Sequence, residues 1–408
     1  MATRRRRRLP PMDVPLALSA LGLVTIGLLT VFSATYAPGA HEGLWVRQLV
    51  WALAAVVAAW LAASIHYRVY DSLADPIYAV SLVLLVLVLA MGSSAYGAKR
   101  WLEIGPIKFQ PSELAKIAMV MALARHLDDP NLNLRRIRYW FPAAVLALIP
   151  FALVVREPDL GTSLSFPVIL MVMLYWAGLP VRNLLLALTP VFNAALFFVT
   201  GSLWWFGGLF LVMLGVIRPR LTTLLAVVVL NGAVSYALPH VWNGLADYQQ
   251  RRIHTFLDPN HDPYGAGYQI IQSKIAIGSG GAWGTGYLKG TQKRLAFLPM
   301  RHTDFIYSVV GEEMGLLGAL TVVILYALLI LRGLRLAVVS RSVFASLMAV
   351  GLVTALFYHI MVNMLMTIGW APVTGLPLPL LSYGGTALIV NGIEIGLLQN
   401  VALRRHEF

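Results

Sequence analysis

Long apolar runs alternate with short connectors along almost the whole chain, and each run has about 20 residues or slightly fewer, the length that an α-helix needs to cross a membrane. Hydrophobic residues make up 59% of the 408 residues, charged residues make up 12%, and the mean hydropathy is +0.74. Such a composition is too apolar for a soluble domain with a solvated surface. We therefore predict an all-α polytopic membrane protein with about 12 transmembrane helices. The predicted spans are residues 14–34, 49–65, 76–92, 112–126, 141–155, 162–178, 184–200, 203–217, 221–239, 306–331, 343–365 and 385–402.

The distribution of Lys and Arg predicts the orientation of these helices, because cytoplasmic connectors carry an excess of positive charge. The run from Arg4 to Arg8 directly precedes the first span, and most other arginines lie in alternate connectors on the same side. Both termini are therefore predicted to be cytoplasmic. The long segment 240–305 then lies on the outer side of the membrane.

This orientation divides the chain into a basic cytoplasmic N-terminus (1–13), one transmembrane domain (14–403) and a short cytoplasmic tail (404–408). The first span is too long for a cleaved signal peptide. The net charge of +13 follows from the orientation of the helices, so we predict no nucleic acid among the partners. The absence of cysteine from the sequence excludes a disulfide, a thiolate nucleophile and a Cys-ligated metal.

The segment 240–305 is the longest charge-bearing interruption between apolar runs, and it contains two Asp-Pro steps. The second step, Asp262-Pro263, precedes the sequence YGAGYQIIQSKIAI. Asp262 could cap a helix that Pro263 begins. Alternatively, it is a carboxylate held above the membrane, where it accepts a proton from a hydroxyl nucleophile. The residues alone leave both interpretations open.

Basic residues outnumber acidic residues in this outer segment, and they include Arg252, Lys274 and Arg301. They could form an ordinary solvated loop face, or they could bind an anionic ligand that carries phosphate. The glycine-rich run 278–281 could present backbone N–H groups to such a phosphate, although a simple turn explains it equally well.

Two charged motifs border other predicted spans. Glu113 and Lys116, in QPSELAK, lie three residues apart and so share one helix face. They form either a structural ion pair or part of a functional site, since ionisable groups near lipid are costly. Asp159, in EPDLGT, either caps the next helix or faces the same cavity as Glu113 and Lys116.

The sequence GLPLPLLSYGG (375–385) places two prolines and a glycine pair where a span should begin. Non-helical backbone at membrane depth is tolerated only against protein or a water-filled cavity. We therefore predict a re-entrant turn that lines a cavity, with Ser382 and Tyr383 as polar contributors. The alternative is that these two residues merely cap the last helix.

Together, these motifs resemble the SEDS family of bacterial envelope proteins (shape, elongation, division and sporulation). The motifs that carry the resemblance are RWLEIGPIKFQPSELAK (100–116), EPDLGTS (157–163), DPYGAGYQIIQSKIAIGSGG (262–281), GTQ (290–292), FLPMRHTDFIYSVVGEE (297–313) and GLPLPLLSYGG (375–385). They cover most of the chain in the expected order. The GTQ motif and Arg301 are more similar to the elongation branch than to the division branch.

The resemblance implies a peptidoglycan glycosyltransferase that polymerises lipid II at the outer face of the bacterial cytoplasmic membrane during elongation. Its implied partner is a class B penicillin-binding protein, a transpeptidase that cross-links the strands. Membrane lipids surround it. In the family the acid of the DPxGxGY motif is essential, which maps to Asp262, and we predict Asp262 as the general base. The predicted substrate-binding residues are Glu113, Lys116, Asp159, Arg252, Lys274, Arg301, His302 and Ser382.

Glycosyl transfer from a diphosphate lipid also needs positive charge on the leaving group. We predict that Arg252 and Lys116 supply it, with Lys274 or a divalent cation such as Mg²⁺ as further candidates. The sequence assigns no cofactor and predicts no set of metal ligands.

Two features depart from the family pattern. The family has roughly ten spans, so we interpret 184–217 as an additional helical hairpin. Glu394 lies in the middle of the last span, where the resemblance assigns it no role. Two other functions remain as alternatives: a lipid II flippase, in which Lys116 and Glu394 mark a polar path, and a non-catalytic scaffold for the penicillin-binding protein.

Overall fold

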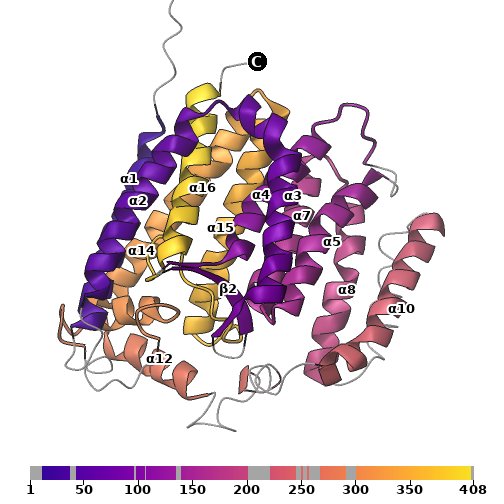
Figure 1. Ribbon diagram of the computed structural model, residues 1–408. Coiled ribbons are helices and arrows are strands. Elements are labelled where there is room, and N and C mark those ends of the chain that lie inside the picture. The colour runs from indigo at the N-terminus through magenta and orange to yellow at the C-terminus, as the bar shows by residue number, and fades with distance from the viewer. Residues whose placement is uncertain are drawn as a thin grey trace, which may run out of the picture.

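A computed structural model describes residues 12–36, 43–95, 98–105, 107–134, 139–200, 221–244, 250, 255–256, 267–290 and 300–405. Helices dominate these residues (Figure 1), so the predicted helical fold is confirmed. The helices are α1 (Val14–Thr35), α2 (Leu44–Ser64), α3 (Tyr67–Met91), α4 (Pro111–Leu127), α5 (Phe141–Arg156), α6 (Leu160–Ser163), α7 (Ser165–Trp176), α8 (Val181–Thr200), α10 (Leu221–Gly244), α12 (Tyr268–Ser279), α14 (Ile306–Val339), α15 (Val343–Thr367) and α16 (Gly385–Arg404).

Each predicted span coincides with described helix, except 203–217, which lies outside the described residues. In the described part of the chain, 6 helices are long and apolar enough to cross a membrane: α1, α2, α3, α14, α15 and α16. The apolar stretches Phe141–Arg156 and Leu160–Trp176 are shorter. The total of about 12 spans, the second half of the extra hairpin and the orientation of the termini stay predictions.

Three helices form the centre of the bundle. In α4, nearly every side chain is buried, including Glu113 and Lys116, and most of α15 and α16 is buried as well. By contrast, α2 and α3 expose large apolar side chains such as Trp60 and Val80. Because the outer helices present apolar surface to lipid, the polar side chains of the central helices are shielded from it.

The packing of α2 against α16 depends on small residues. An added Cβ would lie 2.4 Å from the Ala55 carbonyl oxygen at Gly392, and 2.3 Å from the Ala59 carbonyl oxygen at Gly396. Gly392 and Gly396 on α16 are four residues apart, and so are Ala55 and Ala59 on α2. This spacing of small residues lets two helix backbones approach closely in a membrane. This contact holds the middle of α16 against α2, and the beginning of α16 borders the site described below.

A small antiparallel sheet connects α3 to α4. It consists of β1 (Ser93–Ala95), β2 (Ala98–Ile104) and β3 (Ile107–Phe109), with β2 in the middle. The sheet lies in the half of the bundle away from the C-terminus (Figure 1). The all-α prediction was wrong for this segment. Its strands are short, and the turn between β2 and β3 relies on Gly105 at a φ of 63°, a conformation that glycine adopts readily.

Tight backbone contacts join the segment after α12 to α14. An added Cβ at Gly280 would lie 1.9 Å from the Gly311 carbonyl oxygen, and one at Gly284 would lie 2.1 Å from the Glu313 carbonyl oxygen. The α14 helix is kinked at Gly315, which has a φ of 64°. The glycine-rich run 278–281 therefore serves close packing against α14 rather than the presentation of a phosphate-binding turn.

Buried polar contacts hold the opposite end of the bundle, where α1 begins and α16 ends (Figure 1). The Arg332 guanidinium donates to Asp13 at 2.5 Å, and the Gln399 side-chain amide donates to the Asp13 carbonyl oxygen at 2.8 Å. Arg404 donates to the carbonyl oxygens of Ala63 and Ser64 at 2.9 and 2.8 Å. These contacts join α1, α2, α14 and α16.

Candidate active site

A cavity of about 710 Å³ lies beside the sheet and the beginnings of α4 and α16. It joins three of the motifs that the sequence singled out: the segment around Gln110, the turn at Asp159 and the loop that begins at Gly375. The lining residues are Val46, Arg47, Val50, Trp51, Arg100, Trp101, Lys108, Gln110, Glu113, Asp159, Thr162, Thr303, Asp304, Gly375, Leu376, Pro377, Tyr383, Gly384, Gly385, Thr386 and Ala387. We call it the polar pocket.

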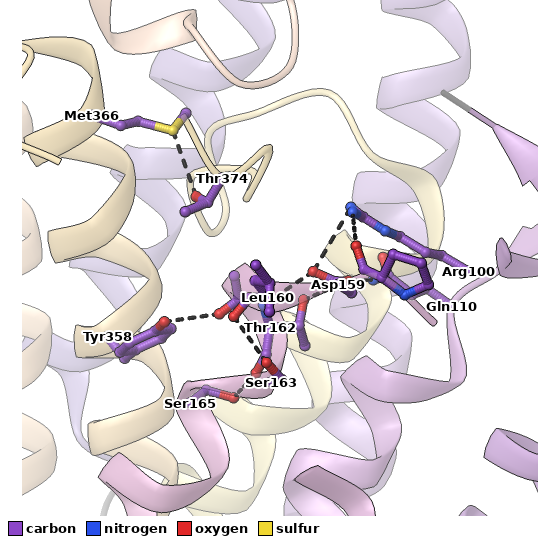
Figure 2. Close-up of polar contacts among 12 residues, drawn as sticks. Arg100, Gln110, Asp159, Leu160, Thr162, Ser163, Ser165, Tyr358, Met366 and Thr374 are labelled. Atoms are coloured by element: carbon purple, nitrogen blue, oxygen red, sulfur yellow. Dashed lines mark hydrogen bonds and ion pairs between the residues drawn. The ribbon is translucent and has the colours of Figure 1, made fainter. Parts of the chain in front are cut away.

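Asp159 lies at the wall of the polar pocket and is 1% exposed. Its carboxylate accepts hydrogen bonds from the Thr162 backbone N–H at 3.1 Å, the Thr162 hydroxyl at 2.9 Å and the Gln110 side-chain amide at 3.2 Å (Figure 2). The Arg100 guanidinium is 3.7 Å away. Asp159 thus caps α6 and also faces a cavity that Glu113 lines but Lys116 does not, so the two interpretations are compatible.

The turn that carries Asp159 is fixed to α15. The Tyr358 hydroxyl donates to the Gly161 carbonyl oxygen at 2.8 Å (Figure 2). An added Cβ at Gly161 would approach the Thr374 side chain to 2.9 Å. A larger residue at 161 would therefore displace the loop that forms the opposite wall of the pocket.

Glu113 and Lys116 form the ion pair that their spacing predicts, with Nζ 2.9 Å from Oε2. Glu113 lines the pocket, whereas Lys116 lies behind it, is 2% exposed and is also 2.6 Å from His359 Nε2 on α15. The pair is nearly inaccessible to water, so each charge depends on the other. His359 was missed at the sequence level because a single histidine in an apolar helix carries no motif.

The polar pocket is also lined by three basic residues that we did not predict as site residues. Arg47 comes from α2, Arg100 from β2 and Lys108 from β3. The Arg100 guanidinium also donates to the Pro158 carbonyl oxygen at 2.8 Å, and Lys108 pairs with Glu103 at 2.9 Å. Because the sheet was not predicted, nothing in the sequence indicated that Arg100 lies beside Asp159 or that these three cations line one cavity.

The loop before α16 lines the pocket as predicted, with Tyr383 among its polar contributors. Ser382 lies behind that wall, where its hydroxyl donates to the Thr303 carbonyl oxygen at 2.7 Å and accepts from the Leu378 N–H at 2.8 Å. Gln48 of α2 donates to the Ser382 carbonyl oxygen at 3.0 Å. These hydrogen bonds hold the loop in place, so Ser382 has a structural role.

Arg301 and His302 precede the lining residues Thr303 and Asp304. The Arg301 guanidinium donates to the Ala34 carbonyl oxygen at 2.9 Å, which ties this segment to α1. The His302 carbonyl oxygen accepts from the Tyr383 N–H at 2.9 Å, and the two rings meet edge to face. Within the described residues, neither side chain lines the polar pocket.

Lys274 is exposed on α12, and its stem packs against Gly369, where an added Cβ would lie 2.3 Å from Lys274 Cε. It is not one of the described lining residues of the pocket. Asp262 and Arg252 lie outside the described residues, so their predicted roles stay predictions. The described part of the chain contains no group of three or more His, Asp or Glu side chains that could hold a metal ion.

Apart from Arg47, the residues of α2 that line the polar pocket are mainly apolar. Val46 and Val50 are 45% and 59% exposed, and Trp51 lies beside them. Exposed valines on a membrane-spanning helix face lipid. The pocket therefore combines charged residues at one wall with an apolar edge where α2 meets the surrounding bilayer.

Comparison with known proteins agrees with the resemblance seen in the motifs. The family model for FtsW, RodA and SpoVE, described as a cell cycle protein, matches residues 12–206 and 199–407. The peptidoglycan glycosyltransferase MrdB of Escherichia coli is 39% identical over 399 residues, covering 97% of this chain and 94% of that protein. The peptidoglycan glycosyltransferase RodA of Treponema pallidum is 35% identical, covering 98% of this chain and 100% of that protein.

Solved structures share the fold as well. A chain from a peptidoglycan synthase complex, described for its structural coordination of polymerization and crosslinking, has a TM-score of 0.74 and 32% identity, covering 97% of this chain and 99% of that chain. The crystal structure of the rod shape determining protein RodA of Thermus thermophilus has a TM-score of 0.65 and 27% identity, covering 97% and 98%.

Proposed function

This chain belongs to the FtsW/RodA/SpoVE family, and we propose that it is a peptidoglycan glycosyltransferase that polymerises lipid II in the polar pocket during cell elongation. The relatives MrdB and RodA are named peptidoglycan glycosyltransferases and match nearly the whole chain. The location of the active site is supported by one observation: three family motifs line the same cavity.

The chemistry requires a base for the attacking sugar hydroxyl and positive charge on the departing diphosphate. We assign the base to Asp262. This residue lies six positions before Tyr268, where α12 begins, and the described residues Thr303 and Asp304 of the same outer segment line the pocket. A carboxylate there would take the proton of the acceptor hydroxyl while the glycosidic bond forms with inversion and the diphosphate leaves.

Arg100 is the cation best placed for the diphosphate, with Arg47 and Lys108 on neighbouring elements. Arginine suits this role because its planar group donates two parallel hydrogen bonds to phosphate. We keep Arg252 and Lys274 as further contributors. Lys116, behind Glu113, would act through that carboxylate rather than by touching the leaving group.

The apolar edge at Val46 and Val50 offers a route for the polyprenyl tail, which would remain in the lipid while the diphosphate enters the pocket. This arrangement fits a multi-pass protein of the bacterial inner membrane whose active site faces outward, where lipid II is polymerised. A class B penicillin-binding protein would cross-link the strands, consistent with the similar chain from a synthase complex.

A divalent cation such as Mg²⁺ remains a candidate helper for the diphosphate. The described residues offer no three-ligand metal cluster, so we route no step of the reaction through a metal. Activity measured with and without a chelator, in the presence of the partner, would decide whether one is needed.

The test is the Asp262→Asn protein, purified with its partner and supplied with lipid II. We expect polymerisation to fall by about 10²–10⁴-fold, the usual contribution of a general base. Asp75→Asn, which changes an exposed carboxylate near Arg125, is the matched control and should polymerise normally. Near-normal turnover of a folded Asp262→Asn protein would refute the base assignment. Transbilayer movement of labelled lipid II without polymerisation would favour a flippase.

A further inference from the structure

Glu157 is a buried carboxylate in the EPDLGTS motif, and neither the resemblance nor the proposed reaction assigns it a role. It lies in the turn between α5 and α6 and is 0% exposed. Neither of its carboxyl oxygens has a hydrogen-bond partner within the described residues. A buried polar group without partners is costly, and an ionised one far more so. Such a group in a native protein calls for an explanation.

The neighbours of Glu157 explain why it stays without a partner. Two residues away, Asp159 accepts three hydrogen bonds and lies beside Arg100. Arg100 is the cation that acts on both carboxylates, and it is bonded to the Pro158 carbonyl oxygen between them. Two carboxylates thus share one guanidinium, and Asp159 has all the hydrogen bonds that stabilise a negative charge.

Not every hydrogen-bond donor of the Arg100 side chain has a partner among the described residues. Its Nε is buried without a hydrogen-bond partner in the described part of the chain, and its terminal nitrogen is 3.7 Å from Asp159. Part of the hydrogen-bonding capacity of the guanidinium, which lies between the pocket and the turn that carries the two acids, is therefore unused by the described residues. A second negative charge in that turn would draw it away from the pocket.

We propose that Glu157 is a positioning residue that keeps its proton in the working enzyme, so that Arg100 is paired with Asp159 alone and remains directed toward the pocket. This inference rests on the proposed function, because Arg100 is assigned there to the diphosphate. Glu157 itself touches no substrate. Its neutral carboxyl fills the turn without competing for the one nearby cation.

The electrostatic environment supports this protonation state. Burial raises the pKa of Glu157 to about 8, repulsion from Asp159 adds to the increase, and Arg100 opposes it. From α15, the Tyr358 hydroxyl is bonded to the Gly161 carbonyl oxygen, four residues beyond Glu157. Glu157 is therefore mostly protonated at pH 7 and loses its proton as the pH rises through about 8.

The experiment compares the wild-type protein with Glu157→Gln, a neutral residue of the same shape, each with its partner. At pH 7 we expect kcat of the variant within about threefold of wild type. As the pH rises through about 8, wild-type kcat should fall. The kcat of the variant should not show this fall. A variant that folds but loses more than about tenfold at pH 7, or that keeps the same alkaline fall, would overturn the proposal.

A second measurement does not depend on activity. Infrared difference spectra between pH 7 and pH 9 should show a larger loss of protonated carboxylic acid in the wild type than in Glu157→Gln, with Asp75→Asn as the control that matches wild type. An identical signal in wild type and Glu157→Gln would overturn the proposal. If the Gln variant fails to fold, Glu157→Met replaces it in both measurements. Because this signal is independent of polymerisation, it separates failure of the Glu157 proposal from failure of the proposed function.

Discussion

Two buried polar networks, one around Asp13 and one around Arg100 at the opposite end of the bundle, differ in how completely their hydrogen bonds are made. At the end where α1 begins, Asp13 is bonded to Arg332, to the Leu16 N–H and to Gln399, so its polar atoms are well satisfied. At the sheet end, charged side chains surround a cavity, and Glu157 and the Nε of Arg100 lack hydrogen-bond partners within the described residues. One network is closed, whereas the other is open.

The difference indicates what each network is for. A closed buried network stabilises the packing of helices, whereas an incomplete one keeps charged groups available at a cost in stability. Changes at the Asp13 end should therefore alter thermal stability more than turnover. Changes at the polar pocket should lower turnover even where stability is kept or restored by a second substitution, and the predictions below test this contrast.

The largest of these effects is expected for Lys116→Met. Removing the ammonium leaves Glu113 buried without its ion pair, which costs about 3–5 kcal/mol, and changes the charge at the pocket wall. We expect polymerisation to fall by at least about 100-fold and the thermal midpoint to drop. In the double variant Glu113→Gln/Lys116→Met, stability should recover and turnover should not. Recovery of both would show that the pair is only structural.

A smaller effect is expected for Arg100→Gln. Loss of a charged hydrogen-bond donor to the diphosphate costs about 1.5–3 kcal/mol, which corresponds to roughly 10-fold to 100-fold in kcat/KM. Arg125→Gln removes an arginine in the last turn of α4, at the other end of that helix, and serves as control. Equal rates for the two variants in a polymerisation assay would contradict a role for Arg100 in the reaction.

Asp13→Asn should change turnover least. Asparagine keeps a capping oxygen for α1 but loses the ion pair with Arg332, which we expect to cost about 1–3 kcal/mol. Burial works to raise the pKa of Asp13, but the Arg332 and Leu16 hydrogen bonds outweigh it, so the pKa lies below its usual value. The wild-type ion pair therefore contributes stability at neutral pH that is lost on acidification.

Thermal unfolding across a pH series measures this effect. The variant should melt at a lower temperature at pH 7, approach wild type in acid, and polymerise at the wild-type rate when folded. A large loss of kcat in Asp13→Asn would contradict the division of roles between the two ends.

Several parts of the fold and site followed from the sequence because they depend on local patterns. The apolar runs predicted the helices, and the three-residue spacing predicted the Glu113 and Lys116 pair. The prolines and glycines of 375–385 predicted non-helical backbone at a cavity wall. In each case the information lies within a few neighbouring residues.

Other parts depend on contacts between distant segments and could not be predicted. Arg100 approaches Asp159 only because three short strands form a sheet. His359 reaches Lys116 from a helix far along the chain. Glu157 belongs to a motif that we quoted, but its burial without partners is visible only when the turn is packed against the rest of the protein.

The most direct test of the central claim, that the polar pocket holds the diphosphate sugar, is photo-crosslinking with a lipid II analogue that carries a photoreactive group near its diphosphate. The protein is irradiated in lipid nanodiscs with its partner, and the labelled peptides are identified by mass spectrometry. Our account predicts labelling of peptides that contain Arg100, Asp159 or Tyr383, suppressed by excess lipid II. Competable labelling confined to the Asp13 and Arg332 end would contradict it.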